Sequence, residues 1–90
     1  MNNAEALKWY YKAAEQGVAE AQFILGLDYK RGEGGVEKDF AKGAEWYRKA
    51  AEQGHMYALY NLAECYEYGE GVPKDKETAI KLYQKAAEQG

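Results

Sequence analysis

The hydrophobic positions of this chain follow a four-residue spacing, which places them on one face of an α-helix. The same residue types occur in this spacing twice, as Ala21, Leu25 and Tyr29 and again as Ala58, Leu62 and Tyr66. We therefore expect two equivalent helices, from about Val18 to Arg31 and from about His55 to Tyr68. A glycine follows each of them, and glycine readily takes the left-handed conformation that ends a helix.

A helix of a second kind is predicted after each of these. Asp39 and Asp75 suit the N-cap position, and each helix would end at a glycine, Gly54 or Gly90. Its apolar and small positions are Ala44, Trp46, Tyr47, Ala50 and Ala51 in the first copy and Ala79, Leu82, Tyr83, Ala86 and Ala87 in the second. We expect Trp46 to be largely buried between repeats.

The chain is internally repetitive, and the repeat sets the predicted architecture. The motif Ala-Ala-Glu-Gln-Gly occurs three times, ending at Gly17, Gly54 and Gly90, at spacings of 37 and 36 residues. One additional glycine in the first unit, Gly35, accounts for the difference. Self-similarity at this period is typical of helical repeat proteins. The expected fold class is all-α: an α-solenoid of about 2.5 helix-loop-helix repeats, with about five antiparallel helices in a right-handed superhelix.

The repeats divide one predicted domain, residues 1–90, into three parts. Residues 1–17 form a half repeat, and residues 18–54 and 55–90 form two complete ones. In the half repeat, Asn2 takes the N-cap position and Glu5 completes a capping box three residues later.

The repeated motif resembles the Sel1-like repeat, a relative of the tetratricopeptide repeat. The residues that carry the resemblance are Ala21, Leu25, Gly26, Tyr29, Gly32, Gly34, Val36, Asp39, Ala44, Trp46, Tyr47, Ala50, Ala51 and Gly54. The second unit matches them closely, with Ala63 in place of Gly26 and Leu82 in place of Trp46. The resemblance implies an adaptor-type binding scaffold. A cysteine-rich branch of the family is associated with penicillin binding and β-lactamase activity, but that branch carries paired cysteines and this chain has only Cys65.

The related tetratricopeptide fold implies where a partner would bind. There the first helix of each unit lines the concave side of the superhelix. Transferred to this sequence, that geometry gives a candidate groove for a peptide or protein: Glu20, Phe23, Leu27, Lys30, Arg31, Tyr57, Tyr60, Glu64, Glu67 and Tyr68. Aromatic residues that the core does not require are typical interface anchors. For Phe23 and Tyr60 the alternative is packing between neighbouring helices.

The composition excludes several classes of function. The net charge of −3 argues against nucleic-acid binding by phosphate neutralisation. One cysteine, one histidine and no serine leave no intrachain disulfide, no two-histidine metal site and no serine nucleophile. The glycine-rich loops follow helices and lack the lysine–hydroxyl pair of a phosphate-binding loop, so we interpret them as turns. We expect no enzyme activity, no cofactor and no metal.

Two classes of function remain. The first is a scaffold that binds a protein or peptide segment, with weak self-association through the C-terminal helix. The alternative is an engineered or designed repeat protein with no natural ligand, which the near-identical motif copies and the absence of serine favour. No signal peptide or membrane-spanning segment is recognisable, so we expect a soluble protein that needs no disulfide, in an unknown compartment.

Overall fold

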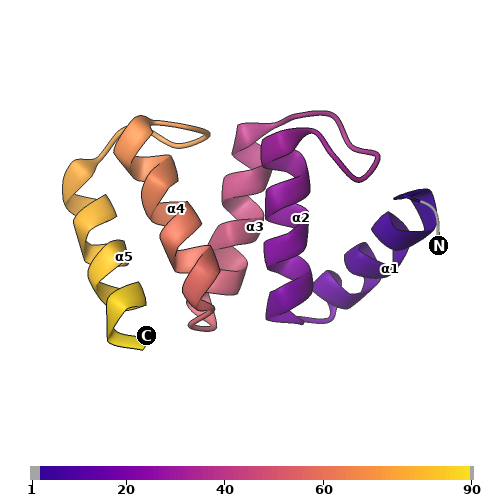
Figure 1. The fold of residues 1–90 in the computed structure, drawn as a ribbon, viewed down its shortest axis with the longest axis horizontal. Coiled ribbons are helices and arrows are strands. Elements are labelled where there is room, and N and C mark those ends of the chain that lie inside the picture. Colours follow the sequence, from indigo (N-terminus) through magenta and orange to yellow (C-terminus); the bar gives the residue numbers. More distant parts are fainter. Residues whose placement is uncertain (1–2, 90) are drawn as a thin grey trace.

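The computed structural model describes residues 3–89, and within that range the secondary structure consists of helices joined by loops, without strands. The helices are α1 (Asn3–Glu15), α2 (Ala19–Arg31), α3 (Phe40–Glu52), α4 (Met56–Tyr68) and α5 (Lys76–Gln89) (Figure 1). This confirms the all-α repeat fold expected from the sequence. The predicted capping residue Asn2 lies outside the described residues.

The predicted helix ends are set by glycine and aspartate. Gly32 and Gly69 have φ of 70° and 69°, and their N–H groups donate to carbonyls of the preceding turn. The side chain of Asp39 accepts from the N–H of Lys42 at 3.1 Å and so caps α3. Asp75 caps α5 in the same way. The two glycines end helices and the two aspartates begin them because of their local chemistry, independently of the core.

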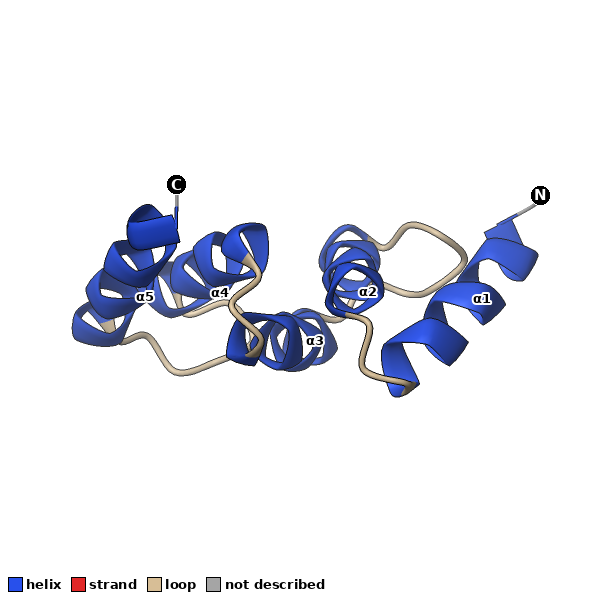
Figure 2. Cartoon of the chain, turned by 90° about the horizontal axis from the view of Figure 1, so that it is seen from below, coloured by secondary structure: helices blue, strands red, loops and turns tan. Residues whose placement is uncertain are grey.

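Each helix packs against the next one in the sequence, which gives an elongated molecule of 39 × 24 × 17 Å. In Figure 2, α2 and α4 lie at about the same height, and α3 lies below them and between the two. Helix α3 therefore joins the two repeats: it packs against α2 of its own repeat and against α4 of the next.

The centre of the fold is Tyr47, whose side chain is fully buried. It belongs to a cluster drawn from α3, α4 and α5, onto which Phe23 and Leu27 of α2 pack. A Cβ at Gly26 would lie 2.5 Å from the Tyr47 ring, so this glycine is needed for the close approach of α2 and α3. A second cluster, around Ala14, Ala21 and Leu25, joins α1 to α2.

Trp46 packs against the second cluster, between the half repeat and the first complete repeat, and is partly buried there. The Tyr11 ring lies edge-on to it at 5.8 Å, and the Lys49 ammonium lies 4.7 Å from the ring centre. The neighbouring residue, Tyr47, is buried completely in the main cluster. Tyr47 and Tyr83 are 36 residues apart, and at the same spacing Ala79 corresponds to the buried Gly43 and Ile80 to Ala44, so Ala79 is not the counterpart of Ala44.

Candidate protein-interaction surface

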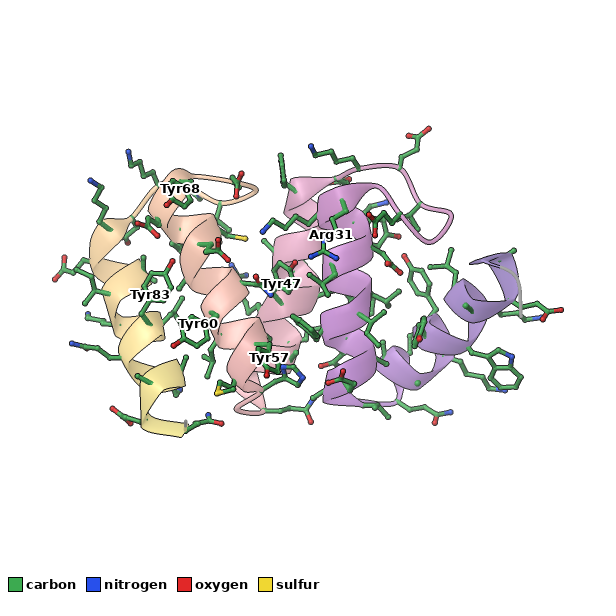
Figure 3. All side chains as sticks on the ribbon, in the orientation of Figure 1. Arg31, Tyr47, Tyr57, Tyr60, Tyr68 and Tyr83 are labelled. Carbon is green, nitrogen blue, oxygen red and sulfur yellow. The ribbon has the colours of Figure 1, made fainter. Side chains whose placement is uncertain are left out.

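The ten residues predicted to form a groove come from α2 and α4, and we call this set the α2–α4 face. It comprises Glu20, Phe23, Leu27, Lys30, Arg31, Tyr57, Tyr60, Glu64, Glu67 and Tyr68. Figure 3 shows Tyr57, Tyr60 and Tyr68 following one another along α4, with Arg31 across from them on α2. These three tyrosines are 59%, 41% and 64% exposed. Phe23 and Leu27 are half-buried and pack onto the main core cluster.

Aromatic rings connect α2 to α4 at one end of this face. The Phe23 ring stacks on His55 with a centroid separation of 4.8 Å and lies 6.1 Å from the ring of Tyr57. The two interpretations of the aromatic residues, packing between helices and exposure as interface anchors, therefore each apply to a different residue here. Phe23 packs against its neighbours, whereas Tyr57 leaves most of its surface to solvent.

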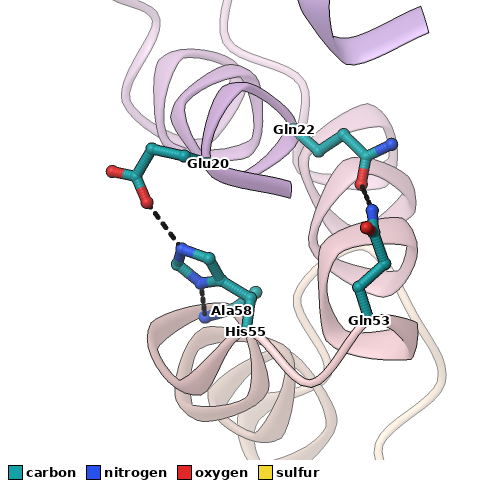
Figure 4. Close-up of polar contacts among 5 residues, drawn as sticks. All are labelled: Glu20, Gln22, Gln53, His55 and Ala58. Atoms are coloured by element: carbon teal, nitrogen blue, oxygen red, sulfur yellow. Dashed lines mark hydrogen bonds and ion pairs between the residues drawn. The ribbon is translucent and has the colours of Figure 1, made fainter. Parts of the chain in front are cut away.

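His55 fixes the start of α4 and links it to α2 (Figure 4). Its Nδ1 accepts a hydrogen bond from the N–H of Ala58 at 3.2 Å, so this nitrogen carries no proton. The neutral ring therefore has its proton on Nε2, which donates to Oε2 of Glu20 at 2.7 Å. The sequence pattern predicts His55 only as the approximate start of this helix. The signal that could have found its role is its position three residues before Ala58, where an N-cap acceptor is needed.

Gln53, the glutamine of the second motif copy, joins the first complete repeat to the half repeat (Figure 4). Nε2 of Gln53 donates to the carbonyl oxygen of Gly17 at 2.9 Å and to Oε1 of Gln22 at 3.0 Å. Gln22 is buried, and its own Nε2 donates to the carbonyl oxygen of Ala14 at 3.1 Å. Gln53 thus satisfies polar groups at and near the turn that ends the half repeat, a role that its sequence pattern did not reveal.

At the other side of α4, Tyr60 and Glu67 contact α5. The rings of Tyr60 and Tyr83 lie 5.8 Å apart, and the Tyr83 hydroxyl donates to Oε1 of Glu67 at 2.7 Å. Burial, followed by this hydrogen bond and the Glu67 charge, raises the pKa of Tyr83. Glu67 is therefore already engaged within the fold.

Two buried groups lie beneath the face and are chemically inert. The hydroxyl of Tyr47 is the buried side-chain polar atom without a hydrogen-bond partner among the described residues. Burial raises the pKa of the Cys65 thiol to about 11, so that it remains protonated at neutral pH. Cys65 is 3% exposed, which is a core position rather than that of a nucleophile.

Within residues 3–89 we find no group of three or more His, Cys, Asp or Glu side chains that could hold a metal ion. Nor does any helix in this range have the length and apolar character needed to cross a membrane.

Five consecutive helices stacked in pairs, with the same contacts recurring about one repeat apart, define a helical repeat protein of the solenoid class. The family model of the Sel1 repeat matches residues 2–18, 19–55 and 57–90, and the chain therefore belongs to the Sel1 repeat family. Proteins of this family are generally non-enzymatic scaffolds for protein–protein interaction.

Solved structures of Sel1-repeat proteins superpose closely on this chain. The protective antigen c5321 of uropathogenic Escherichia coli is 43% identical with a TM-score of 0.94, over 99% of this chain and 19% of that one. A Sel1 repeat protein from Oxalobacter formigenes is 45% identical with a TM-score of 0.94, over 99% of this chain and 36% of that one. Helicobacter pylori cysteine rich protein B is 29% identical with a TM-score of 0.95, over 100% of this chain and 67% of that one. No curated protein sequence matches the chain significantly. The chain spans about a fifth of the length of the Escherichia coli protein and about a third of the length of the Oxalobacter formigenes protein.

Proposed function

We propose that the chain is a non-catalytic interaction scaffold whose α2–α4 face binds a peptide or protein segment. The supporting observation is the exposure of Tyr57, Tyr60 and Tyr68, which the core does not require. Tyrosine buries a large area on binding at a small cost in side-chain entropy, and its hydroxyl tolerates water when no partner is present. Half-buried Phe23 and Leu27 would give the face an apolar floor.

Selection of peptides from a random displayed library, with the purified chain as the target, tests this function. We expect the selected peptides to bind the double variant Tyr57→Ser/Tyr68→Ser about tenfold or more weakly, because two anchors are lost. Trp9→Ser is the matched control, since Trp9 is 60% exposed but lies on α1. Peptides that respond to the Trp9 variant and not to the tyrosine variant would place the binding surface elsewhere.

The alternative function, a designed repeat protein without a natural ligand, is favoured by the near identity of the three motif copies. It predicts a different result from the same selection: no peptide whose binding depends on the exposed tyrosines.

We also propose weak self-association through α5. Ile80 is 56% exposed, whereas the corresponding Ala44 of α3 is 2% exposed beneath α4. Light scattering coupled to size exclusion, over a wide concentration range, should show a mass that rises with concentration, and Ile80→Lys should abolish the rise. Leu82 is less suitable for this variant because it packs onto the main core cluster. A constant monomer mass for the unmodified chain would contradict self-association.

A further inference from the structure

Charged residues are distributed unevenly over the α2–α4 face. Helix α4 carries four tyrosines and two glutamates but neither lysine nor arginine. The basic residues of the face, Lys30 and Arg31, both lie in the last turn of α2. In Figure 3, Arg31 lies toward the Tyr68 end, while Tyr57 and Tyr60 lie toward the opposite end. The two glutamates of α4 lie between Tyr60 and Tyr68, and Glu20 lies in the first turn of α2, so no lysine or arginine of the face lies at its Tyr57 end.

Of the acidic residues on this face, Glu20 and Glu67 already have partners within the fold. Glu20 accepts from His55, and Glu67 accepts from the Tyr83 hydroxyl. Glu64 is half-buried and makes no hydrogen bond or ion pair with another residue of the described range. A half-buried carboxylate is less well solvated than an exposed one, so a cation brought to it interacts more strongly.

The charge of Glu64 is felt by the groups around it on three helices. Burial raises the pKa of Tyr47, Cys65 and Tyr83, and in all three cases the negative charge of Glu64 adds to the increase. The opposing cations are those of α2: Arg31 lowers the pKa of Tyr47, and Lys30 lowers that of Cys65. Glu64 thus acts on groups of α3, α4 and α5, and the cations that oppose it on two of these groups belong to α2.

The rings beside Glu64 are arranged to receive a cation. The Tyr57 ring lies against Phe23 of α2 with its plane tilted by 30°, and the Tyr60 ring lies against Tyr83 of α5 with a tilt of 58°, at centroid separations of 6.1 and 5.8 Å. These contacts restrain both rings while leaving 59% and 41% of the two side chains exposed. An ammonium or guanidinium group placed over such a ring is attracted by its quadrupole, most strongly when partly desolvated.

We propose that Tyr57, Tyr60 and Glu64 form a subsite for a lysine or arginine side chain in an extended segment of a partner protein. The inference rests on the proposed scaffold function and specifies the chemistry of its partner. Electrostatic complementarity selects this occupant, because an acidic segment along α4 would face Glu64 and Glu67 without a compensating cation on that helix. Lys30 and Arg31 restrict the cation to the Tyr57–Tyr60 end of the face.

Three labelled peptides of equal length, rich in glycine and serine, provide the test. They carry arginine, its neutral isostere citrulline, or glutamate at the same positions. We expect the arginine peptide to bind the chain about tenfold more tightly than the citrulline peptide, because only the former brings a charge to the carboxylate. Added salt should weaken arginine-peptide binding.

Variants of the chain separate a built subsite from general attraction to a negatively charged protein. Glu64→Gln should weaken binding of the arginine peptide about 5- to 10-fold. Glu45→Gln removes the same charge from an exposed position on α3 and should change the affinity for the arginine peptide less than about 1.5-fold. Tyr57→Leu keeps an apolar side chain but removes the ring, and should weaken binding about 2- to 5-fold.

The contrary outcomes separate this inference from the proposed function. Equal losses in Glu64→Gln and Glu45→Gln, or no binding of the arginine peptide, would overturn the cation subsite. The citrulline or glutamate peptide could instead bind as tightly as the arginine peptide, with Tyr57→Leu weakening that binding. The face would then be an interaction surface for a partner of other chemistry. The scaffold function itself fails only if the library selection also returns no peptide that depends on the exposed tyrosines.

Discussion

The two complete repeats, α2–α3 and α4–α5, carry the same sequence pattern and bury it to different depths. Tyr47 of α3 is fully buried, whereas Tyr83, at the corresponding position of α5, is half-buried. Within residues 3–89, the main packing contacts of α3 are with two helices, α2 and α4, and those of α5 are with α4. The depth of burial is therefore set by the number of neighbouring helices and not by the residue type.

The small residues at the contact between the paired helices also differ between the two repeats, and the closer packing is again in the first. The α2–α3 contact uses Gly26 and Gly43, and a Cβ added at Gly43 would lie 3.0 Å from the carbonyl oxygen of Gly26. The corresponding residues of α4 and α5 are Ala63 and Ala79, which are both buried. The backbones of α2 and α3 therefore pack directly against each other beside the fully buried Tyr47. At the α4–α5 contact, a methyl group lies on each side.

The largest expected difference between the repeats comes from truncating the two tyrosines. Tyr47→Ala should lower the free energy of unfolding by about 3–5 kcal/mol, because it leaves a cavity that several helices line. Tyr83→Ala should lower it by about 1–2 kcal/mol, since solvent reaches part of the space. Urea denaturation followed by circular dichroism measures both. Equal losses would show that α3 and α5 contribute equally to the core.

A smaller difference is expected when the small residues are exchanged. Gly26→Ala places a methyl group 2.5 Å from the buried Tyr47 ring and should cost about 1–3 kcal/mol, despite the better helix propensity of alanine. Ala63→Gly removes a methyl group and should cost about 1–2 kcal/mol through propensity and lost packing. The double variant Gly26→Ala/Tyr47→Phe controls for the hydroxyl and should remain destabilised. A stabilised Gly26→Ala would mean that α2 and α3 separate without cost.

The order of elements, their approximate ends and the repeat period could all be predicted from the sequence, because they depend on local chemistry. Glycines at 32 and 69 and aspartates at 39 and 75 act on their own turns. The depth to which Trp46 and Tyr47 are each buried could not be predicted. Adjacent helical positions differ by about 100° in direction, and both residues are aromatic, so the placement of the neighbouring helices sets how deeply each is buried.

The candidate surface shows the same limit. Helical spacing placed Tyr57 and Tyr68 opposite the core face, and both are exposed. The contact between Glu20 and His55 joins residues 35 positions apart, so no local pattern indicates it. Likewise, Gln53 bonds to the carbonyl oxygen of Gly17, 36 positions earlier, and only the stacking of repeats brings these two groups together.

The third comparison concerns the tyrosine hydroxyls alone. The Tyr47 hydroxyl is buried without a hydrogen-bond partner, so Tyr47→Phe should leave stability unchanged or raise it by up to about 1 kcal/mol. Tyr83→Phe removes the hydrogen bond to Glu67 and should lower stability by about 0.5–1.5 kcal/mol. Opposite signs for the two substitutions are the expected result in thermal or urea unfolding. A loss of more than about 1 kcal/mol in Tyr47→Phe would reveal a partner for that hydroxyl.

The smallest expected effect distinguishes the caps of α3 and α5. Asp39 accepts from the N–H of Lys42, whereas Asp75 accepts from both the N–H and the hydroxyl of Thr78, at 3.1 and 2.7 Å. These hydrogen bonds, that from the hydroxyl first, hold the pKa of the Asp75 carboxyl below its usual value of 3.8. The folded state therefore binds this proton less readily than the unfolded chain. The contribution of the cap is present above about pH 4 and is lost as the pH falls through the lowered pKa.

Thr78→Val removes the hydroxyl and should move the pKa of Asp75 back toward its usual value, with Asp39 as the internal control, because the two carboxyls share only the backbone contact. Carbon-detected NMR of the side-chain carboxyls through an acid titration measures both pKa values in one sample. The lowest pH at which α5 remains helical should rise slightly in the variant. If Asp75 titrates at the same pH with valine as with threonine, the hydroxyl does not stabilise the carboxylate, and the two caps are equivalent despite their different hydrogen bonds.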